Sequence, residues 1–537
     1  MDSAKRLTLT AAIMGSFVVG IDATVVNVAL PSIERDLGGG LAGQQWVVNA
    51  YLLLLGSLIL IGGSLGDLVG KRRIFRIGVG GFGVVSALCA IAPSIETLVA
   101  ARALQGIFGA LLTPAALAII IATFPPRERG GAIGSWTAWG GIATVVGPLV
   151  GGQIVDSTSW RLIFAINVPF VIVTLLLSVR IPEGQDGRAR PHVDWVGATL
   201  AALGLAGPTL ALIQQPRRGW DDPLVLGAGL GGLALLGAFL LWERHHREPM
   251  LPLAMFRRRN FAVGNVETFC MYAGLGVVFF FLVLFLQQVA GYSALQAGTA
   301  TLPITVIMFF LSKRFGALAD RVGSRLFMGV GPLVAATGLA LFLRLHRDVS
   351  YLGELLPALV VFGLGLSLTV APLTATVLAD ADESNAGIAS ATNNAIARVA
   401  GLLATAAIGA IVAAQFGSAL DENLAGARLD ARAQAAVRAA KQSPLGTPDT
   451  RGLSRGQREQ LTQAGAAASE KAFHVGLGVA AALVALGGIL GGVGIVNRRD
   501  RGEDCRDVRA QGCPGGQLVG QPEDVARILP QPVHAAA

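Results

Sequence analysis

Charged residues are scarce in this chain, and their scarcity limits what kind of protein it is. Asp, Glu, Lys and Arg make up 14% of its 537 residues, whereas soluble domains carry about 25%. Hydrophobic residues reach 53%, and the mean hydropathy is +0.61. Most of the chain is therefore expected to lie in lipid, which excludes an ordinary soluble domain.

Motifs of the common catalytic and metal sites are also missing. Cys89 and Cys270 lie in apolar runs, and Cys505 and Cys513 lie in a polar tail without a nearby His. Neither a disulfide framework nor a zinc site follows from them. The sequence has no G-x-x-x-x-G-K-[ST] loop for a nucleotide and no nucleophile-elbow motif with plausible partners. We therefore expect no enzyme activity, no metal and no cofactor.

Long apolar runs are the main feature that is present. A membrane-spanning helix needs about 20 mostly apolar residues, and the alternating pattern of a membrane β-barrel does not recur here. The sequence predicts an all-α membrane protein with fourteen transmembrane helices. The predicted spans are 8–31, 44–66, 74–93, 98–123, 131–155, 162–181, 193–214, 223–242, 261–289, 294–315, 326–344, 351–379, 387–415 and 472–496.

The distribution of basic residues gives the orientation. The net charge is +8, and Lys and Arg gather in short loops on one side, for example at 71–76 and 257–259. Such loops are typically cytoplasmic, so we expect both termini in the cytoplasm and the protein in the cell (inner) membrane. Basic loops of this kind suit contact with anionic membrane lipids, and we expect no nucleic acid as a partner.

One loop motif occurs twice. Residues 63–72 and 316–325 both follow the pattern G-x-L-x-D-x-x-G-x-R, each between two long apolar runs. Weaker matches extend on both sides, so spans 1–6 correspond to spans 9–14. We predict an N-terminal six-helix half at 1–181, two inserted linker helices at 193–242, a C-terminal six-helix half at 261–496 with an outer loop at 416–471, and a disordered cytoplasmic tail at 497–537. Two like halves around a central site are typical of secondary transporters.

The repeated loop suits a conformational switch. Its glycines allow a tight turn and close helix contact, and its Asp lies at a helix end, where it can face a helix N-terminus or a cytoplasmic Arg. Such a bond can hold the outward-facing state and break on switching. The alternative is a topology anchor with an incidental Asp. The predicted switch residues are Gly63, Asp67, Gly70, Arg72, Gly316, Asp320, Arg321, Gly323 and Arg325.

Two charged residues of the first half suit proton coupling. Asp22 lies in the middle of an apolar span, where a carboxylate is unfavourable by about 2.5–3.5 kcal/mol and usually has a function. Arg102, in the fourth span, could pair with Asp22 or with a bound substrate, and proton binding would then loosen the pair. The alternatives are an Asp22 that only bonds Thr24 or the backbone, and an Arg102 that reaches the outer interface.

Glu267 and Arg398 are the corresponding candidates in the second half. Glu267 could be a second proton site or could contact a cationic substrate. Alternatively, it is solvated near the cytoplasmic interface and paired with the basic cluster 257–259. Arg398 lies about three turns into the thirteenth span, which is too deep for a loop charge, and we expect a pairing or gating role.

A third motif lies in the fifth span. Gly147, Pro148, Gly151 and Gly152 interrupt the helix hydrogen bonds and leave a smooth face. We expect this face to pack tightly and to seal the inner side against leak. The alternative is an ordinary proline kink with close helix packing.

These motifs together resemble those of the major facilitator superfamily, in particular its fourteen-span drug:proton antiporter family. The resemblance covers about residues 5 to 500, and the first loop departs from it, because Leu68 stands where an Arg usually follows the Asp. Further matching stretches are 21–31, Arg102 to Gly106, 147–152, 291–298 and 393–401.

The resemblance implies efflux of amphipathic or lipophilic, often cationic, compounds in exchange for protons, by alternating access and in a monomer. Two alternatives remain open. The chain could be a dedicated exporter of an endogenous lipid, siderophore or amino acid, or a non-transporting membrane sensor of the same fold.

Overall fold

The described part of this computed structural model is helical and contains no strand. It comprises residues 3–179, 181, 193–379, 386–427, 429–446 and 448–497, so most of the predicted tail lies outside it, with Cys505 and Cys513. Thirteen of the described helices are long and apolar enough to cross a membrane. The remaining predicted span, 162–181, corresponds to the shorter apolar stretch Leu162–Ser178. Helices follow from the composition because backbone groups in lipid need partners within their own segment.

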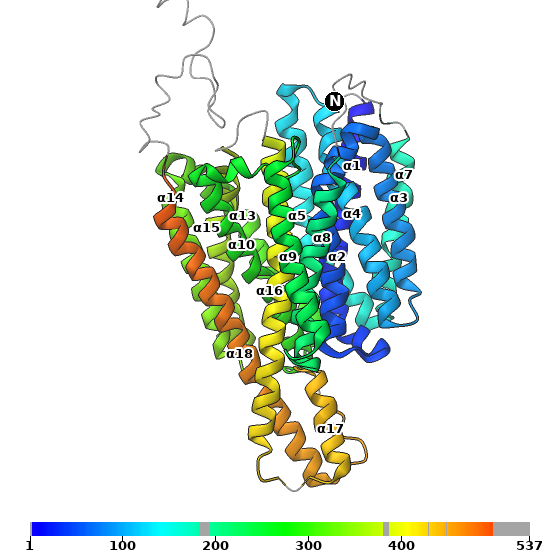
Figure 1. Cartoon of the computed structure of the whole chain (residues 1–537), viewed down its shortest axis with the longest axis vertical. Helices are drawn as coiled ribbons and strands as arrows, with labels where there is room; N and C mark the ends of the chain where they lie inside the picture. The colour runs from blue at the N-terminus through cyan, green and yellow to red at the C-terminus, as the bar shows by residue number, and fades with distance from the viewer. Residues whose placement is uncertain are drawn as a thin grey trace, which may run out of the picture. The chain divides into compact units, whose positions relative to one another are not determined.

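The first six predicted spans correspond to seven helices (Figure 1). The sixth span is broken between α6 and α7, where Pro169 has no N–H to donate to the carbonyl of Ala165. The helices are α1 (Ser3–Leu37), α2 (Gly40–Val69), α3 (Lys71–Ala90), α4 (Ile95–Thr123), α5 (Pro126–Ser157), α6 (Leu162–Ala165) and α7 (Asn167–Ser178).

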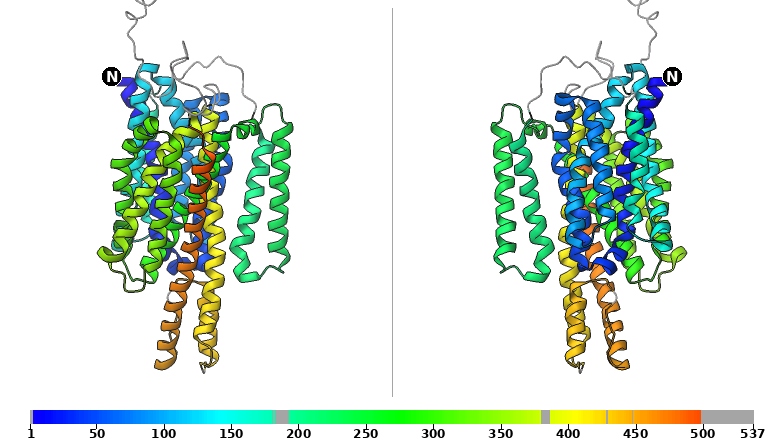
Figure 2. Two further views of the ribbon diagram at one scale, coloured as in Figure 1. Left: turned by 90° about the vertical axis from the view of Figure 1, so that its left-hand side faces the viewer. Right: turned by 90° about the vertical axis from the view of Figure 1, so that its right-hand side faces the viewer.

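The two inserted helices are α8 (Trp195–Arg218) and α9 (Pro223–His245). They pack against each other, and α8 also contacts α2 and α16. Figure 2 shows the pair beside the other helices.

The second half repeats the first with more interruptions. A π-helical turn, Val278–Leu282, joins α10 and α11 into one span, and short turns at Phe342–Arg344 and Tyr351–Leu355 lie between α14 and α15. The helices are α10 (Arg259–Val277), α11 (Val283–Gln288), α12 (Ala294–Ala300), α13 (Leu302–Val322), α14 (Ser324–Leu341), α15 (Leu356–Ala379), α16 (Ala386–Asn423), α17 (Ala431–Gln442) and α18 (Arg455–Gly494).

The predicted outer loop, 416–471, is mostly helical. Helix α16 continues to Asn423, α17 follows, and α18 begins at Arg455, after Ser454 caps its first turn. The segment is rich in Ala, the best helix former, so its stretch 418–441 could be expected to be helical from the sequence. It lies at the opposite end from the N-terminus (Figure 1), and Ser443 donates to Glu34 of α1.

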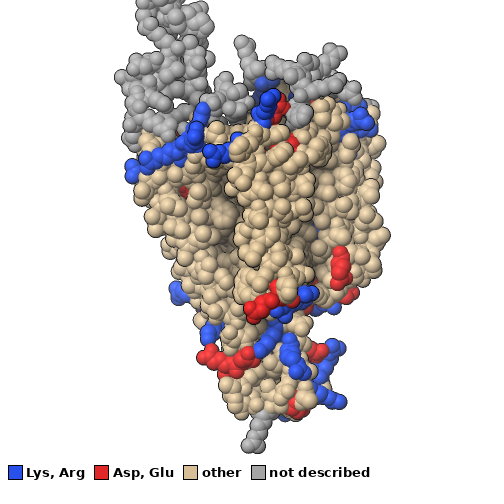
Figure 3. Space-filling view, viewed as in Figure 1, with Lys and Arg blue, Asp and Glu red and all other residues tan. Residues whose placement is uncertain are grey.

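Charged side chains are unevenly distributed along the helices. On the face in Figure 3, charged side chains gather toward the two ends and the middle is largely uncharged. The start of α1 and the end of α18 lie at the same end (Figure 1), which is the inner end in the predicted topology. Residues 1–495 form one compact unit, so the two predicted halves share extensive contacts.

Candidate functional site

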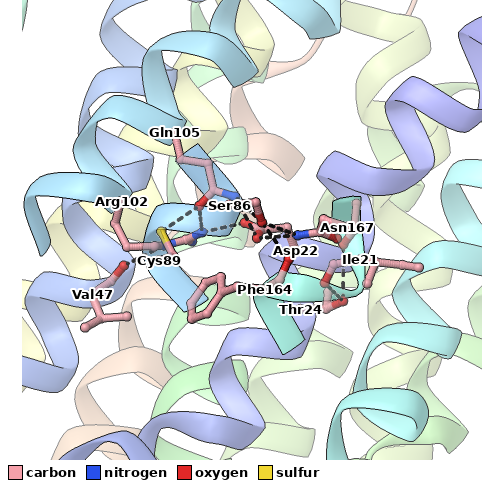
Figure 4. Close-up of polar contacts among 11 residues, drawn as sticks. Ile21, Asp22, Thr24, Val47, Ser86, Cys89, Arg102, Gln105, Phe164 and Asn167 are labelled. Carbon is pink, nitrogen blue, oxygen red and sulfur yellow. Dashed lines mark hydrogen bonds and ion pairs between the residues drawn. The ribbon is translucent and has the colours of Figure 1, made fainter. Parts of the chain in front are cut away.

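The first half encloses a polar centre around Asp22 (Figure 4). Asp22 is 0% exposed, and its Oδ2 lies 2.5 Å from Nη1 of Arg102 on α4. Its Oδ1 accepts hydrogen bonds from Gln105 at 3.0 Å and from Asn167 at 3.2 Å. The carboxylate is therefore held by side chains from α4 and α7, and Thr24 bonds to backbone carbonyls instead.

Arg102 is as fully enclosed as its partner. It is 1% exposed, which excludes the alternative of a side chain that reaches the interface. Its Nε donates to the carbonyl of Val47 at 3.1 Å, and Nη1 also donates to Gln105 Oε1 at 2.6 Å. The guanidinium stacks on the ring of Tyr51, 4.3 Å from its centroid, a favourable cation–π geometry. The sequence prediction that Asp22 and Arg102 could pair agrees with this geometry.

Three uncharged side chains complete the centre, and sequence reasoning gave them no role. Gln105 and Asn167 each also donate to the hydroxyl of Ser86 on α3, at 3.4 and 3.0 Å. Ser86 in turn donates to the carbonyl of Phe164 at 2.9 Å. The sequence offered one signal for each amide. Gln105 belongs to the matching stretch Arg102 to Gly106, and Asn167 is a polar residue in an apolar run.

This arrangement can change its hydrogen bonds when a proton arrives. A buried carboxylate held by an Arg is stable as an ion pair, and removing one charge leaves the other unpaired. Protonation of Asp22 would leave Arg102 with neutral acceptors only. Because Asp22 is bonded from α4 and α7, the rearrangement would act on three helices of the half together.

Glu267 lies in a different environment, inside the second half. It is 0% exposed, and neither carboxylate oxygen has a hydrogen-bond partner in the described structure. A Cβ added at Gly491 of α18 would clash with its Oε2. The alternative reading, a solvated Glu267 paired with the cluster 257–259, is wrong: Arg259 donates to the carbonyls of Gly494 and Val493 instead.

Arg398 lies between the halves. A Cβ added at Gly56 of α2 would be 3.2 Å from its Cβ, and its side chain is partly buried. No hydrogen bond or ion pair joins it to a described residue. The pairing role expected for Arg398 therefore has no partner within the described protein.

The two loop copies have matching backbones. Gly70 and Gly323 both have φ 109°, a region that glycine adopts readily. Arg72 donates to the carbonyl of Val179, just after α7, and Arg325 donates to that of Gly492, near the end of α18. Each loop thus ties the third helix of its half to the last helix, a contact that the sequence did not reveal.

The acidic residues of the loops are exposed. Asp67 lies 3.7 Å from Lys71, whereas Asp320 and Arg321 make no hydrogen bond or ion pair with described residues. Gly63 and Gly316 allow only ordinary packing, since a Cβ there would be 3.9 Å from Pro114 and 3.4 Å from Ala371. In the first loop, the expected close helix contact occurs at the preceding residue, Gly62.

That neighbouring glycine packs against the backbone of α4. A Cβ at Gly62 would clash with the carbonyl oxygen of Ala110.

The glycines of the fifth span pack tightly against other helices, as predicted. A Cβ at Gly147 would clash with Thr24, and one at Gly151 with Val25, both on α1. A Cβ at Gly152 would be 2.5 Å from the Cα of Leu295 on α12. Helix α5 begins beside Lys5 and meets α12 at its other end, which is the outer end in the predicted topology. The seal expected at the inner side stays a prediction.

Asp156 strengthens that outer contact. Its carboxylate accepts hydrogen bonds from Ser293 Oγ at 2.6 Å and from the backbone N–H groups of Ala294 and Leu295 at 3.0 and 2.9 Å. The two halves are thus joined at the outer end, between α5 and the start of α12.

Comparison with known proteins agrees with this architecture. A sequence model of the Major Facilitator Superfamily matches residues 12–405. The tetracenomycin C resistance and export protein of Streptomyces glaucescens is 34% identical over 79% of this chain and 78% of its own. A puromycin resistance protein of Streptomyces alboniger is 37% identical over 75% of this chain and 81% of its own.

A solved structure shares the fold. It is a bacterial homologue of the human lysosomal transporter Spinster in an inward-facing, occupied conformation, with a TM-score of 0.65 and 17% identity. The match covers 92% of this chain and 98% of that one.

Proposed function

Because this chain belongs to the major facilitator superfamily, we propose that it exports drug-like molecules in exchange for protons. It is an integral membrane protein of a family of transporters, not enzymes, that carry small molecules. The export direction and the class of cargo follow from relatives named for antibiotic resistance and export. We place it in the inner membrane, with both termini in the cytoplasm, because the basic loops lie on the side of the N-terminus.

The buried Asp22–Arg102 pair carries the proposal of proton coupling. It is a carboxylate within a span, held by a cation and two amides, and intramembrane carboxylates are typical of proton relays. In this state the pair is closed. A proton that reaches Asp22 would neutralise it and release Arg102 toward Val47, Gln105 and the ring of Tyr51.

Alternating access then uses the contacts between and within the halves. The outer contact of α5 with α12 separates when the halves rock, and the loop residues around Asp67 and Asp320 engage or release at the inner end. Arg72 and Arg325 hold each half together, so the halves move as bodies. We assign Glu267 as a second acid, because its carboxylate is buried without a hydrogen-bond partner in the described structure.

Transport into inside-out vesicles tests this proposal. Vesicles energised by respiration should accumulate a lipophilic dye, and a protonophore should abolish accumulation. Asp22→Asn should reduce uptake to the level of the protonophore-treated wild type, since Asn keeps hydrogen bonds but carries no proton. Asp22→Glu is the matched control and should retain part of the uptake.

Membrane abundance must be measured for each variant, because a buried Arg102 without its counter-charge is destabilising. Uphill uptake by Asp22→Asn at the wild-type rate, at equal abundance, would exclude Asp22 as the coupling acid.

A further inference from the structure

Arg398 differs from the other deep charges of this protein in having no acceptor. It lies on α16 and is partly buried, and no described carboxylate or carbonyl accepts its hydrogen bonds. A guanidinium has five N–H donors, and leaving such donors unpaired away from water is unfavourable. Arg102, in contrast, has Asp22, Gln105 and a backbone carbonyl as acceptors.

The position of Arg398 is at the junction of the halves. Its Cβ faces Gly56 of α2, and Gly401, one turn further along α16, packs against Gly276 of α10. Helix α2 belongs to the first half, whereas α10 and α16 belong to the second. Transporters of two like halves place the substrate near the midplane, at this kind of interface.

The remaining deep charges do not balance Arg398. Asp22 is already neutralised by Arg102, and Glu267 is fully buried against α18 on another side of α10. Arg398 is therefore a positive charge at the junction without a counter-charge among the described residues.

Each helix that faces α16 here carries a tyrosine close to its contact glycine: Tyr51 is five residues before Gly56, and Tyr272 is four residues before Gly276. Tyr272 is partly buried, and the hydroxyl of Tyr51 is buried without a hydrogen-bond partner in the described structure. A guanidinium binds carboxylates and similar planar acids through two parallel hydrogen bonds. Phenol rings can contact an aromatic body, and a free hydroxyl can donate to the same acid.

We propose that Arg398 binds the acidic group of an amphipathic organic anion, with Tyr51 and Tyr272 beside it. The substrates would then include aromatic acids, in contrast to the cationic compounds expected from the sequence. This inference rests on the proposed role as a small-molecule exporter. It assigns Arg398 to substrate recognition and leaves proton binding to the carboxylates.

The test measures binding without a proton gradient, so that a failure of proton coupling does not affect it. The full-length protein in phosphatidylcholine nanodiscs is titrated with fluorescein, an anion, and rhodamine 123, a cation with the same ring system. Variants are Arg398→Gln, Arg398→Lys and the control Arg458→Gln, which removes an exposed charge from α18.

We expect Arg398→Gln to weaken fluorescein binding by about tenfold to a hundredfold, as for loss of a charge-assisted hydrogen bond. Arg398→Lys should retain part of the affinity, and Arg458→Gln all of it. Rhodamine binding should be unchanged or tighter in Arg398→Gln. Equal fluorescein affinity in wild type and Arg398→Gln, or binding of rhodamine alone by the wild type, would overturn the proposal.

The acid could belong to a soluble molecule or to a lipid headgroup, and phosphatidylglycerol distinguishes the two. An anionic bilayer repels fluorescein from both proteins equally. This repulsion cancels in the ratio of the wild-type affinity for fluorescein to that of Arg398→Gln. A ratio that falls in phosphatidylglycerol nanodiscs identifies the lipid headgroup as an occupant. An unchanged ratio identifies soluble acids.

Discussion

The two halves contain the same loop but differ in their buried acids. Asp22 is enclosed by an Arg and two amides, whereas Glu267 has no hydrogen-bond partner in the described structure. The loops, in contrast, match down to the φ of 109° at Gly70 and Gly323. The matching loops give both halves the same contact between their third and last helices. Only the first half contains a buried ion pair that a proton could break.

The largest effect in this comparison should come from removing Arg102. Arg102→Met leaves the carboxylate of Asp22 buried without a cation, which should lower the free energy of unfolding by about 3–5 kcal/mol. Thermal unfolding of the purified protein measures this. The double variant Asp22→Asn/Arg102→Met should recover part of the loss, and a double variant no more stable than the single one would argue against a coupled pair.

Replacing Glu267 should have the opposite sign. Glu267→Met keeps the volume and removes two unsatisfied oxygens, so it should stabilise the protein by about 1–3 kcal/mol. The same thermal assay checks it, with Arg102→Met as the contrasting variant. If Glu267→Met instead destabilises the protein as much as Arg102→Met does, the carboxylate has partners in a state that this structure does not contain.

The junction of the halves offers a third test. Gly152→Leu should separate α5 from α12, because its Cβ alone would be 2.5 Å from the Cα of Leu295. Overpacking of this kind is unfavourable by about 1–3 kcal/mol, and it should raise passive dye leak from unenergised vesicles. Gly237→Leu, at a position with nothing within 4 Å, is the control. Equal leak in the two variants would contradict a seal at Gly152.

The smallest effects should come from the repeated loop, and they should be equal. Arg72→Ala and Arg325→Ala each remove a hydrogen bond to a carbonyl at the end of the last helix of a half. Each should lower the free energy of unfolding by about 0.5–1.5 kcal/mol. A large difference between the two variants in thermal unfolding would show that the loops have diverged in energetics while keeping their geometry.

The sequence predicted the helices and the pair, for physical reasons. Lipid requires long apolar runs, so the spans were visible, and Asp22 and Arg102 were conspicuous as charges inside them. Gln105 and Asn167 were not, because uncharged polar residues in spans are common and their direction depends on packing.

Other features depended on contacts between distant segments. Hydropathy could not show that Glu267 faces Gly491 or that Gly152 meets α12, since both depend on helix rotation. The helical nature of 416–471 could be anticipated, because the Ala-rich stretch 418–441 favours a helix and Ser454 with Gln457 suits a helix cap. The bounds of its helices could not.

The length of α18 has a consequence for measurement. This helix has 40 residues, so it is about 60 Å long at a rise of about 1.5 Å per residue. A rigid rod of that length magnifies a small tilt: about 10° at one end displaces the other by about 10 Å, given that rise. The start of α18 therefore moves further than the rest of the helix when the helix tilts. Two fluorophores, one there and one on the first half, would report each rocking step as a change in the distance between them.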